Sequence, residues 1–303
     1  MIFEAEEENI GKRLDSFLSE NMEDMSRSYV QKLIESGNIL INEKNVAKNY
    51  KLRKGDIIKA EIPEAEEIEI KAENIPLDIL YEDDDVIVIN KEQGMVVHPA
   101  AGHYSGTLVN ALMYHCKDSL SGINGKLRPG IVHRIDMDTS GVIVAAKNDA
   151  AHQCLAEQLE KHSIKRIYNA VVERNVKDDE GTIDKPIGRH PTDRKKMAVT
   201  DKNSKRAVTH YKVTERLGKF TVVEFRLETG RTHQIRVHFA SIGHPLVGDT
   251  VYGSKKNTFG LRGQALHARI LGFIHPRTNE YMEFESPLPD YFIKLVEKLI
   301  KLR

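Results

Sequence analysis

Residues 131–141 read Ile-Val-His-Arg-Ile-Asp-Met-Asp-Thr-Ser-Gly, and the apolar run 142–146 follows them. Two β-branched residues lead in and Thr-Ser-Gly is typical of a turn, so we expect a strand, an irregular charged turn and a second strand. The turn carries Arg134 and Asp136, separated by one apolar residue. The two side chains form either a structural ion pair or a reactive carboxylate with a neighbouring cation. The stretch alone leaves both possibilities open.

Length and composition restrict the class of protein. A chain of 303 residues is long for one hydrophobic core, so we expect two domains. Apolar residues make up 40% and charged residues 30%, as in ordinary globular proteins. No apolar run approaches the roughly 20 residues of a membrane span, and the acidic N-terminus has no signal-peptide core. We therefore expect a cytoplasmic protein without a membrane partner, with Cys116 and Cys154 as reduced thiols.

Residues 1–62 are predicted to form a small module of two helices followed by short strands at 39–42 and 57–62. Ser26 is a suitable N-cap for the second helix, and Gly37 a suitable end. Apolar residues at helical spacing define the inner faces: Leu14, Phe17, Leu18, Val30, Leu33 and Ile34. The module resembles the S4 RNA-binding domain rather than a generic helical cap. The resemblance rests on segments 13–15, 26–27, 33–34, 37–39, 41–42 and 54–56.

The S4 resemblance implies that four basic residues meet phosphates of folded RNA: Arg13, Arg27, Lys32 and Lys54. Residues 63–75 are strongly acidic and are predicted to be a linker, although 68–70 could instead be an edge strand. Residues 76–303 are then the large domain.

The large domain alternates strand and helix patterns. We expect strands at 86–90, 95–99, 165–172 and 220–227. We expect helices at 106–115, at 150–161 with Asn148 or Asp149 as cap, at 233–243 with Thr232 as cap, and from Asp290 to the C-terminus. The acidic triplet 83–85 reads as a solvated turn rather than a metal site, because consecutive carboxylates do not converge on one point.

Residues 185–212 hold nine lysines and arginines against Asp193 and Asp201. The formal net charge of the chain is +0, so this concentration stands out. It is either a solvated hairpin tip or a contact for a polyanion, and we favour the second.

Several chemistries lack support in the sequence. His233 and His238 are five residues apart and face different directions on a helix or a strand, so they do not form a chelating pair. Asp136 and Asp138 could hold a hard cation, but Asp138 begins an Asp-Thr-Ser-Gly turn, where its side chain is expected to bond local N–H groups. GxSxG, a P-loop and GxGxxG are all absent. A carboxylate acting as nucleophile or base remains.

At this point a resemblance becomes decisive. The chain resembles the RluA-type pseudouridine synthases in segments 133–141, 165–170, 229–238, 243–249 and 266–268. Glu92 departs from the pattern, because the family usually has Pro after Lys91. We therefore expect an α+β fold in which a central mixed, mainly antiparallel sheet is flanked by helices and loops, preceded by the S4 domain.

The resemblance implies an enzyme that isomerises uridine to pseudouridine in large-subunit (23S) ribosomal RNA. Its catalytic residues would be Asp136, which attacks a flipped uridine, Tyr168, which stacks on the base, and Arg236, which pairs with Asp136. Arg134 would fill the space that the base leaves. Substrate contacts would further include His133, Thr139, Arg231 and Ile235.

The resemblance also implies no cofactor and no metal, because isomerisation consumes nothing. The expected partner is ribosomal RNA or a pre-ribosomal particle, and the expected state is a monomer. An alternative function is a non-catalytic S4-type RNA-binding or ribosome-assembly factor. The target uridines cannot be read from the motifs.

Overall fold

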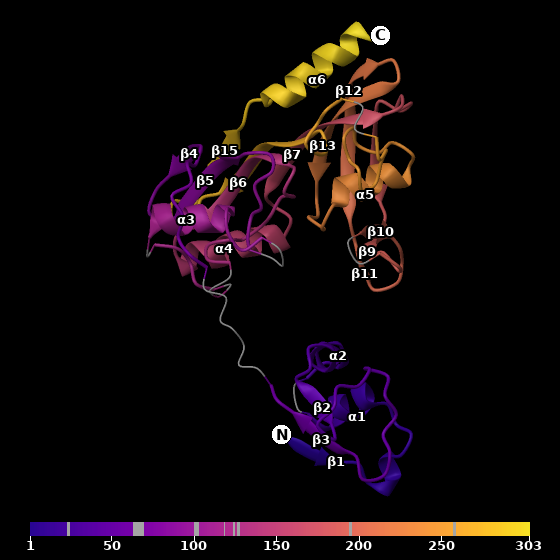
Figure 1. The fold of residues 1–303 in the computed structure, drawn as a ribbon. Helices are drawn as coiled ribbons and strands as arrows, with labels where there is room; N and C mark the ends of the chain where they lie inside the picture. The colour runs from indigo at the N-terminus through magenta and orange to yellow at the C-terminus, as the bar shows by residue number, and fades with distance from the viewer. Residues whose placement is uncertain are drawn as a thin grey trace. The chain divides into compact units, whose positions relative to one another are not determined.

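The structure is a computed structural model that describes residues 1–22, 25–62, 70–99, 103–117, 119–123, 125, 128–193, 196–256 and 259–303. The chain divides into two compact units, Met1–Ile68 and Glu69–Arg303, and Figure 1 shows each with its own secondary structure. Within the described ranges, no helix has the length and apolar character that a membrane crossing requires.

The first unit is built from two helices and a three-stranded antiparallel sheet in the order β1-β3-β2. The side chain of Ser26 accepts a hydrogen bond from the Tyr29 N–H, which confirms the predicted helix cap. The six apolar residues predicted to face inward are all buried in one cluster. The sequence did not reveal β1, which is too short for a periodic pattern. The elements are β1 (Ile2–Glu4), η1 (Glu7–Asn9), α1 (Leu14–Asn21), α2 (Arg27–Glu35), β2 (Ile39–Ile41) and β3 (Ile57–Ala60).

The second unit is organised by a mixed sheet in the order β4-β5-β6-β14-β7-β13-β12-β8, with β15 paired to β14. Only β6 and β14 run parallel among the described strand pairs, so the predicted mixed, mainly antiparallel α+β fold is confirmed. The strands are β4 (Ile79–Glu82), β5 (Val86–Lys91), β6 (Ser140–Ala146), β7 (Lys165–Glu173), β8 (Glu180–Asp184), β12 (Val208–Leu217), β13 (Phe220–Leu227), β14 (Leu266–Ile274) and β15 (Tyr281–Glu285).

Helices flank this sheet, and a small second sheet stands beside one of them. Its three strands, in the order β10-β9-β11, come from the basic segment and lie next to α5 (Figure 1). The Asn148 side chain caps α4, as predicted. The elements are α3 (Leu108–Cys116), α4 (Asp149–Glu160), α5 (Gln234–Ser241), α6 (Asp290–Lys301), β9 (Ile187–Arg189), β10 (Met197–Val199) and β11 (Ser204–Lys205).

Two predicted strands are wrong, and non-local contacts explain both. Residues 95–99 form no strand, because the carbonyls of Val96 and Val97 accept the first N–H groups of α3. The partners of β5 are β4 and β6 instead. Residues 131–132 make a single bridge, from Ile131 to Ala145. The chain then bends, so that the imidazole of His133, rather than a backbone carbonyl, accepts the Val144 N–H.

The start of α5 also differs from the prediction. His233, not Thr232, is the N-cap; it adopts a left-handed conformation with φ 57° and ψ 24°, and makes no side-chain capping bond. The final helix buries Phe292, Leu295 and Leu299, while Ile300 is exposed.

The end of the predicted linker packs on the large unit. Ile70 is 6% exposed within the main core, and the Glu73 carboxylate accepts the Gly106 N–H. Residues 63–69, which include most of the acidic side chains, lie outside the described residues. The linker bounds 63–75 therefore stay a prediction.

The turn that opens β6 depends on a glycine. Gly141 has φ 113°, and a Cβ there would lie 2.1 Å from the Ala268 carbonyl oxygen on β14. We expect Gly141→Ala to destabilise the large unit by about 3 kcal/mol or more, because both the positive φ and the steric clash oppose it. Urea unfolding measures this.

Gly218→Ala is the matched control. Gly218 also has a positive φ of 65°, but no atom lies within 4 Å of its added Cβ. We expect a loss of about 1 kcal/mol for the backbone strain alone. Equal losses for the two variants would contradict a close approach of β6 and β14.

Candidate active site

Four segments that are distant in sequence meet at one cavity of about 510 Å³. Asp136 lies in the turn before β6, Tyr168 lies on β7, and Arg236 lies on α5. The register explains the meeting, because Ala268 of β14 pairs with Gly141 on one side and with Tyr168 on the other. The parallel β6–β14 pair thus brings the charged turn beside the tyrosine.

Asp136 is held by a buried chain of ion pairs. Arg236 donates from Nη1 to Asp136 Oδ2 at 2.9 Å, and binds Asp249 in a bidentate manner, from Nε at 2.6 Å and from Nη2 at 3.0 Å. Burial acts to lower the pKa of Arg236, but Asp249 and Asp136 outweigh it and raise the pKa above its ordinary value. Asp136 thus bonds Arg236 rather than Arg134 among the described residues, and the family resemblance implied the same pair.

Other predicted residues line the same cavity. Tyr168 is 8% exposed, and burial raises the pKa of its hydroxyl, which is therefore neutral at pH 7. Ile235 contributes an apolar wall. Thr139 is 1% exposed and accepts a hydrogen bond from Gln264, so its hydroxyl is already committed within the protein.

The basic residues of the cavity differ in exposure. Arg134 is exposed, and its Nη1 lies 3.4 Å from Nε2 of His98. Arg231 donates from Nε to the Arg206 carbonyl. His133 is bound to the Val144 N–H through Nε2, and burial lowers its pKa to about 3. His133 is therefore neutral, with its proton on Nδ1.

Several supporting residues were not assigned from the sequence. Asp249 anchors Arg236. Arg166 lines the cavity with its Nε buried and unbonded among the described residues. Lys91 is 1% exposed and donates to the carbonyls of Glu92, Met95 and Met137. The signals were present as a Gly-Asp and a Lys-Arg pair within the motifs and as Lys91 before the departure at Glu92, but nothing local indicated the partners of these residues.

Lys91 also bears on the one departure from the family pattern. Glu92 is exposed and contributes only its carbonyl to the ammonium of Lys91. Met137 lies between Asp136 and Asp138, so the bond from Lys91 Nζ to the Met137 carbonyl fixes the backbone of the charged turn. The side chain of residue 92 takes no part in this contact.

The expectation for Asp138 is wrong. Its carboxylate accepts no local N–H; Oδ1 is buried without a hydrogen-bond partner in the described chain and lies 3.9 Å from Arg262 Nε. Burial raises the pKa of Asp138. His238 is buried between the Thr209 hydroxyl and the Lys185 carbonyl, so it does not join His233 in a metal site.

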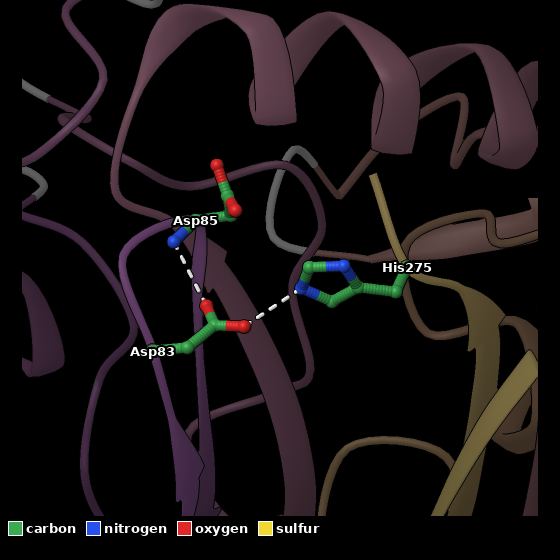
Figure 2. A group of neighbouring side chains, drawn as sticks. All are labelled: Asp83, Asp85 and His275. Carbon is green, nitrogen blue, oxygen red and sulfur yellow. Dashed lines mark hydrogen bonds and ion pairs between the residues drawn. The ribbon is translucent and has the colours of Figure 1, made fainter. Parts of the chain in front are cut away.

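The acidic turn holds the single group of three potential metal ligands found among the described residues: Asp83, Asp85 and His275. Figure 2 shows Asp83 between the Asp85 backbone and the His275 ring. Asp83 Oδ2 lies 2.8 Å from His275 Nε2, while Nδ1 of that ring accepts two backbone N–H groups. Arg277 forms a bidentate bond to Asp85.

The carboxylate oxygens of Asp83 and Asp85 and Nδ1 of His275 thus all accept hydrogen bonds, and a metal ion bound to Asp85 would have to displace Arg277. The group is a structural bracket between the start of β5 and the end of β14. The expectation of a solvated turn is wrong for Asp83 and Asp85, which are anchored, and fits only Asp84, which is exposed.

Basic side chains mark two further surfaces. In the first unit, the buried carboxylate of Asp15 receives bidentate bonds from Arg13 and Arg27, whose side chains remain 43% and 48% exposed. Lys32 is exposed, and Lys54 pairs with Glu7 at the surface. In the second unit, the exposed cations of the basic segment are Lys185, Arg189, Lys202, Lys205, Arg206 and Lys212; Arg194 and Lys195 lie outside the described residues.

Comparisons with known proteins agree with this arrangement. A sequence model of the RNA pseudouridylate synthase family matches residues 85–241, and one of the S4 domain matches residues 12–58. The chain is 54% identical to a Bacillus subtilis (strain 168) protein named uncharacterized RNA pseudouridine synthase YlyB, over 98% of this chain and 97% of that protein.

Two further matches are similar. A Zymomonas mobilis protein named ribosomal large subunit pseudouridine synthase D is 46% identical, over 93% of this chain and 92% of that protein. The solved structure of human RNA pseudouridylate synthase domain containing 1 aligns with a TM-score of 0.58 and 25% identity, over 78% of this chain and 97% of that one.

The mixed sheet, its charged cavity and the attached RNA-binding domain define an RNA-modifying enzyme. The chain belongs to the RNA pseudouridylate synthase family and is an isomerase that converts uridine in RNA to pseudouridine. The family, the enzyme class and the S4 domain predicted from the sequence are confirmed.

Lys91 provides a test of the support beneath the charged turn. Burial lowers the pKa of Lys91 to about 7, although Asp138 and Asp136 oppose the shift. Above this pH the unfolded chain binds a proton that the folded chain has released, so folding stability rises with pH. We expect Lys91→Met to remove a rise of about 2 kcal/mol in the free energy of unfolding between pH 7 and pH 9.

Urea unfolding of wild type and variant at the two pH values measures this difference. Lys219→Met, at the exposed β12–β13 turn, is the control and is expected to keep the wild-type pH dependence. An unchanged pH dependence in Lys91→Met would contradict a lowered pKa for this buried amine.

Proposed function

We propose that the chain converts specific uridines of 23S large-subunit ribosomal RNA to pseudouridine, with Asp136 as the nucleophile that attacks a uridine flipped into the cavity. One observation carries this proposal. Asp136 uses Oδ2 for Arg236, while Oδ1 accepts no hydrogen bond from the described residues and its side chain is 16% exposed in the cavity. At about 510 Å³ the cavity is in the range that holds a small ligand such as a nucleotide base and ribose.

The proposed reaction is balanced within the substrate. The bond between ribose C1′ and uracil N1 breaks, the base turns, and C1′ bonds to C5. The proton of C5 leaves and N1 gains one, so no oxidant, reductant or cofactor is consumed. Asp136 acts by attack either on the ribose or on the base, and Arg236 holds its Oδ2 in both routes.

The remaining cavity residues have roles that fit their positions. Tyr168 presents a neutral aromatic ring beside Asp136, suited to stacking on uracil. Ile235 supplies the apolar wall. Arg134, exposed at the cavity and planar at its end, suits the gap that a flipped base leaves in the RNA. His133 and Arg231 complete the substrate contacts in this proposal.

The choice of ribosomal RNA rests on similarity and charge. The Zymomonas relative is named for the ribosomal large subunit, and the S4 domain is an RNA-binding module. The exposed cations of the basic segment surround the small sheet beside α5, and such a surface binds phosphates. Ribosomal RNA is the partner that these features favour.

The nucleophile is tested by Asp136→Asn. Because the amide cannot act as an anionic nucleophile, we expect pseudouridine formation on 23S ribosomal RNA to fall at least about 10⁴-fold. RNA affinity should stay within about threefold, since the cationic surfaces are unchanged. Mass-spectrometric or chemical mapping of pseudouridine measures turnover, and filter binding measures affinity.

Asp84→Asn is the matched control, because Asp84 is exposed on the β4–β5 turn outside the cavity. It is expected to keep wild-type turnover. Normal turnover by Asp136→Asn would refute the nucleophile. Binding by the wild type without pseudouridine on any ribosomal substrate would instead favour a non-catalytic ribosome-assembly factor.

The polyanion surface is tested on Lys202 and Lys205, which are exposed and have no bonded acidic partner within the described part of the chain. We expect the double Lys→Ala variant to bind RNA about tenfold more weakly near 0.1 M salt, and the slope of log affinity against log salt to fall by about 1 to 2.

Lys294→Ala with Lys301→Ala on α6 removes the same charge away from the basic sheet and the cavity. This variant is expected to leave the salt slope unchanged. Equal effects of the two double variants would mean that net charge, rather than the basic sheet, sets the affinity.

A further inference from the structure

One side chain outside the predicted catalytic set lies near Oδ1 of Asp136, and a second packs against the first. His233 precedes α5 in a left-handed conformation and lines the cavity. Tyr252 lies in the loop after Asp249 and packs edge-on against the His233 ring, with 5.6 Å between ring centroids. Neither residue was assigned a role from the sequence.

The hydrogen bonds of Tyr252 determine where His233 carries its proton. The Tyr252 hydroxyl accepts the backbone N–H of Met197 at 2.8 Å and lies 2.8 Å from His233 Nδ1. A phenol has one proton to donate. If the oxygen also accepted from Nδ1, that proton would have no acceptor among the described groups. Donation by Tyr252 to Nδ1 gives the phenol proton an acceptor within the protein and places the proton of His233 on Nε2.

His233 Nε2 faces the reactive side of Asp136. It lies 3.9 Å from Oδ1, while Oδ2 is occupied by Arg236. At 3.9 Å the N–H makes no hydrogen bond, but its dipole favours negative charge on Oδ1 without occupying a lone pair. The oxygen is thereby aimed and remains available for attack.

We propose that His233, fixed as the Nε2–H tautomer by Tyr252, is a positioning residue that directs Oδ1 of Asp136 toward the substrate. This proposal rests on the proposed function of Asp136 as nucleophile. Arg236 and His233 both neighbour Asp136, and they act on different oxygens of its carboxylate. Arg236 supplies charge and a firm bond to one oxygen, and His233 supplies direction to the other.

A neutral ring suits this role better than a cation. Burial lowers the pKa of His233, and the charge of Arg236 acts in the same direction, although Asp136 and Asp249 oppose both. An imidazolium at this place would bind Oδ1 as an ion pair and compete with the electrophilic carbon. Tyr252 also packs over Arg236, with 5.1 Å from Cζ to the ring centroid, so one residue braces both neighbours of Asp136.

The same hydroxyl links the site to the small sheet, because Met197 begins β10. The position of Tyr252, and with it the tautomer of His233, therefore depends on a sheet whose segment carries the basic surface. The β10 backbone thus contacts Tyr252, Tyr252 contacts His233, and His233 lies near Asp136.

Two substitutions of His233 distinguish a role in positioning Asp136 from a purely structural role. Asn tolerates the left-handed conformation and can accept from Tyr252, but its side chain is too short to present an N–H to Asp136. Gln is longer, and its amide N–H can reach the place of Nε2. We expect His233→Asn to lower the single-turnover rate of pseudouridine formation about 30-fold, with RNA affinity within about threefold.

His233→Gln is expected to recover the rate to within about fivefold of wild type, and Tyr252→Phe to lower it about tenfold. Thermal unfolding confirms that each variant is folded. Wild-type turnover by His233→Asn would overturn the proposal, and so would equal losses in Asn and Gln, which indicate a merely structural role.

A second measurement does not depend on turnover. Nitrogen-15 NMR of the full chain, labelled at histidine and free of RNA, reports the tautomer of each ring. We expect Nε2–H for His233 in the wild type and a mixture in Tyr252→Phe, with the His233→Asn spectrum assigning the signal. His133 is an internal reference with the opposite tautomer, since its Nε2 accepts from Val144.

A proton on Nδ1 of His233 in the wild type would refute the inference whatever the enzyme does. Absence of pseudouridine formation by the wild type would refute the proposed function instead, while leaving the tautomer measurement valid. The two failures are therefore distinguishable.

Discussion

The ion-pair chain from Asp136 through Arg236 to Asp249 is the interaction on which the rest of the large unit depends. A guanidinium that is 7% exposed would be costly alone, and it is stable here because two carboxylates and three hydrogen bonds surround it. The bond to Asp136 joins residues 100 positions apart in sequence. It therefore fixes α5 against the turn before β6, and loss of Asp249 would leave Asp136 as the one carboxylate bonded to the buried guanidinium among the described residues.

Each of the two units contains an ion pair in which one partner is buried and the other is accessible, and the two units differ in which sign of charge is buried. In the S4 unit, Asp15 is buried and receives two arginines whose side chains remain about half exposed, so the carboxylate orients cations that face solvent. In the large unit, Arg236 is buried and orients a carboxylate that faces a cavity. In both places a buried partner restricts the conformational freedom of a charged group that faces solvent or a cavity.

Local sequence patterns correctly predicted those strands and helices that need only burial or a nearby capping residue to form. The β-branched runs of β5, β7 and β13 and the caps of α2 and α4 were correctly identified, because burial and capping depend on nearby residues. The failures at 95–99 and 131–132 occurred where α3 or a histidine side chain takes the backbone bonds of an apparent strand. The pairing of Asp136 with Arg236 came from family resemblance; Lys91, Asp249 and Tyr252 carried no local sign of their contacts.

The sequence by itself determined the family and the two-unit organisation, since these reside in motif chemistry and short-range periodicity. Only the tertiary structure decided that Arg236 bonds Oδ2 of Asp136, that the Tyr252 hydroxyl lies against Nδ1 of His233, and why the Asp83 and Asp85 carboxylates are structural. The physical reason is that a hydrogen bond forms only when the donor–acceptor distance is right to within a few tenths of an ångström. Here the donor and the acceptor belong to residues that lie tens of positions apart in the sequence. Strand register and helix placement fix such distances, and no single stretch of sequence contains them.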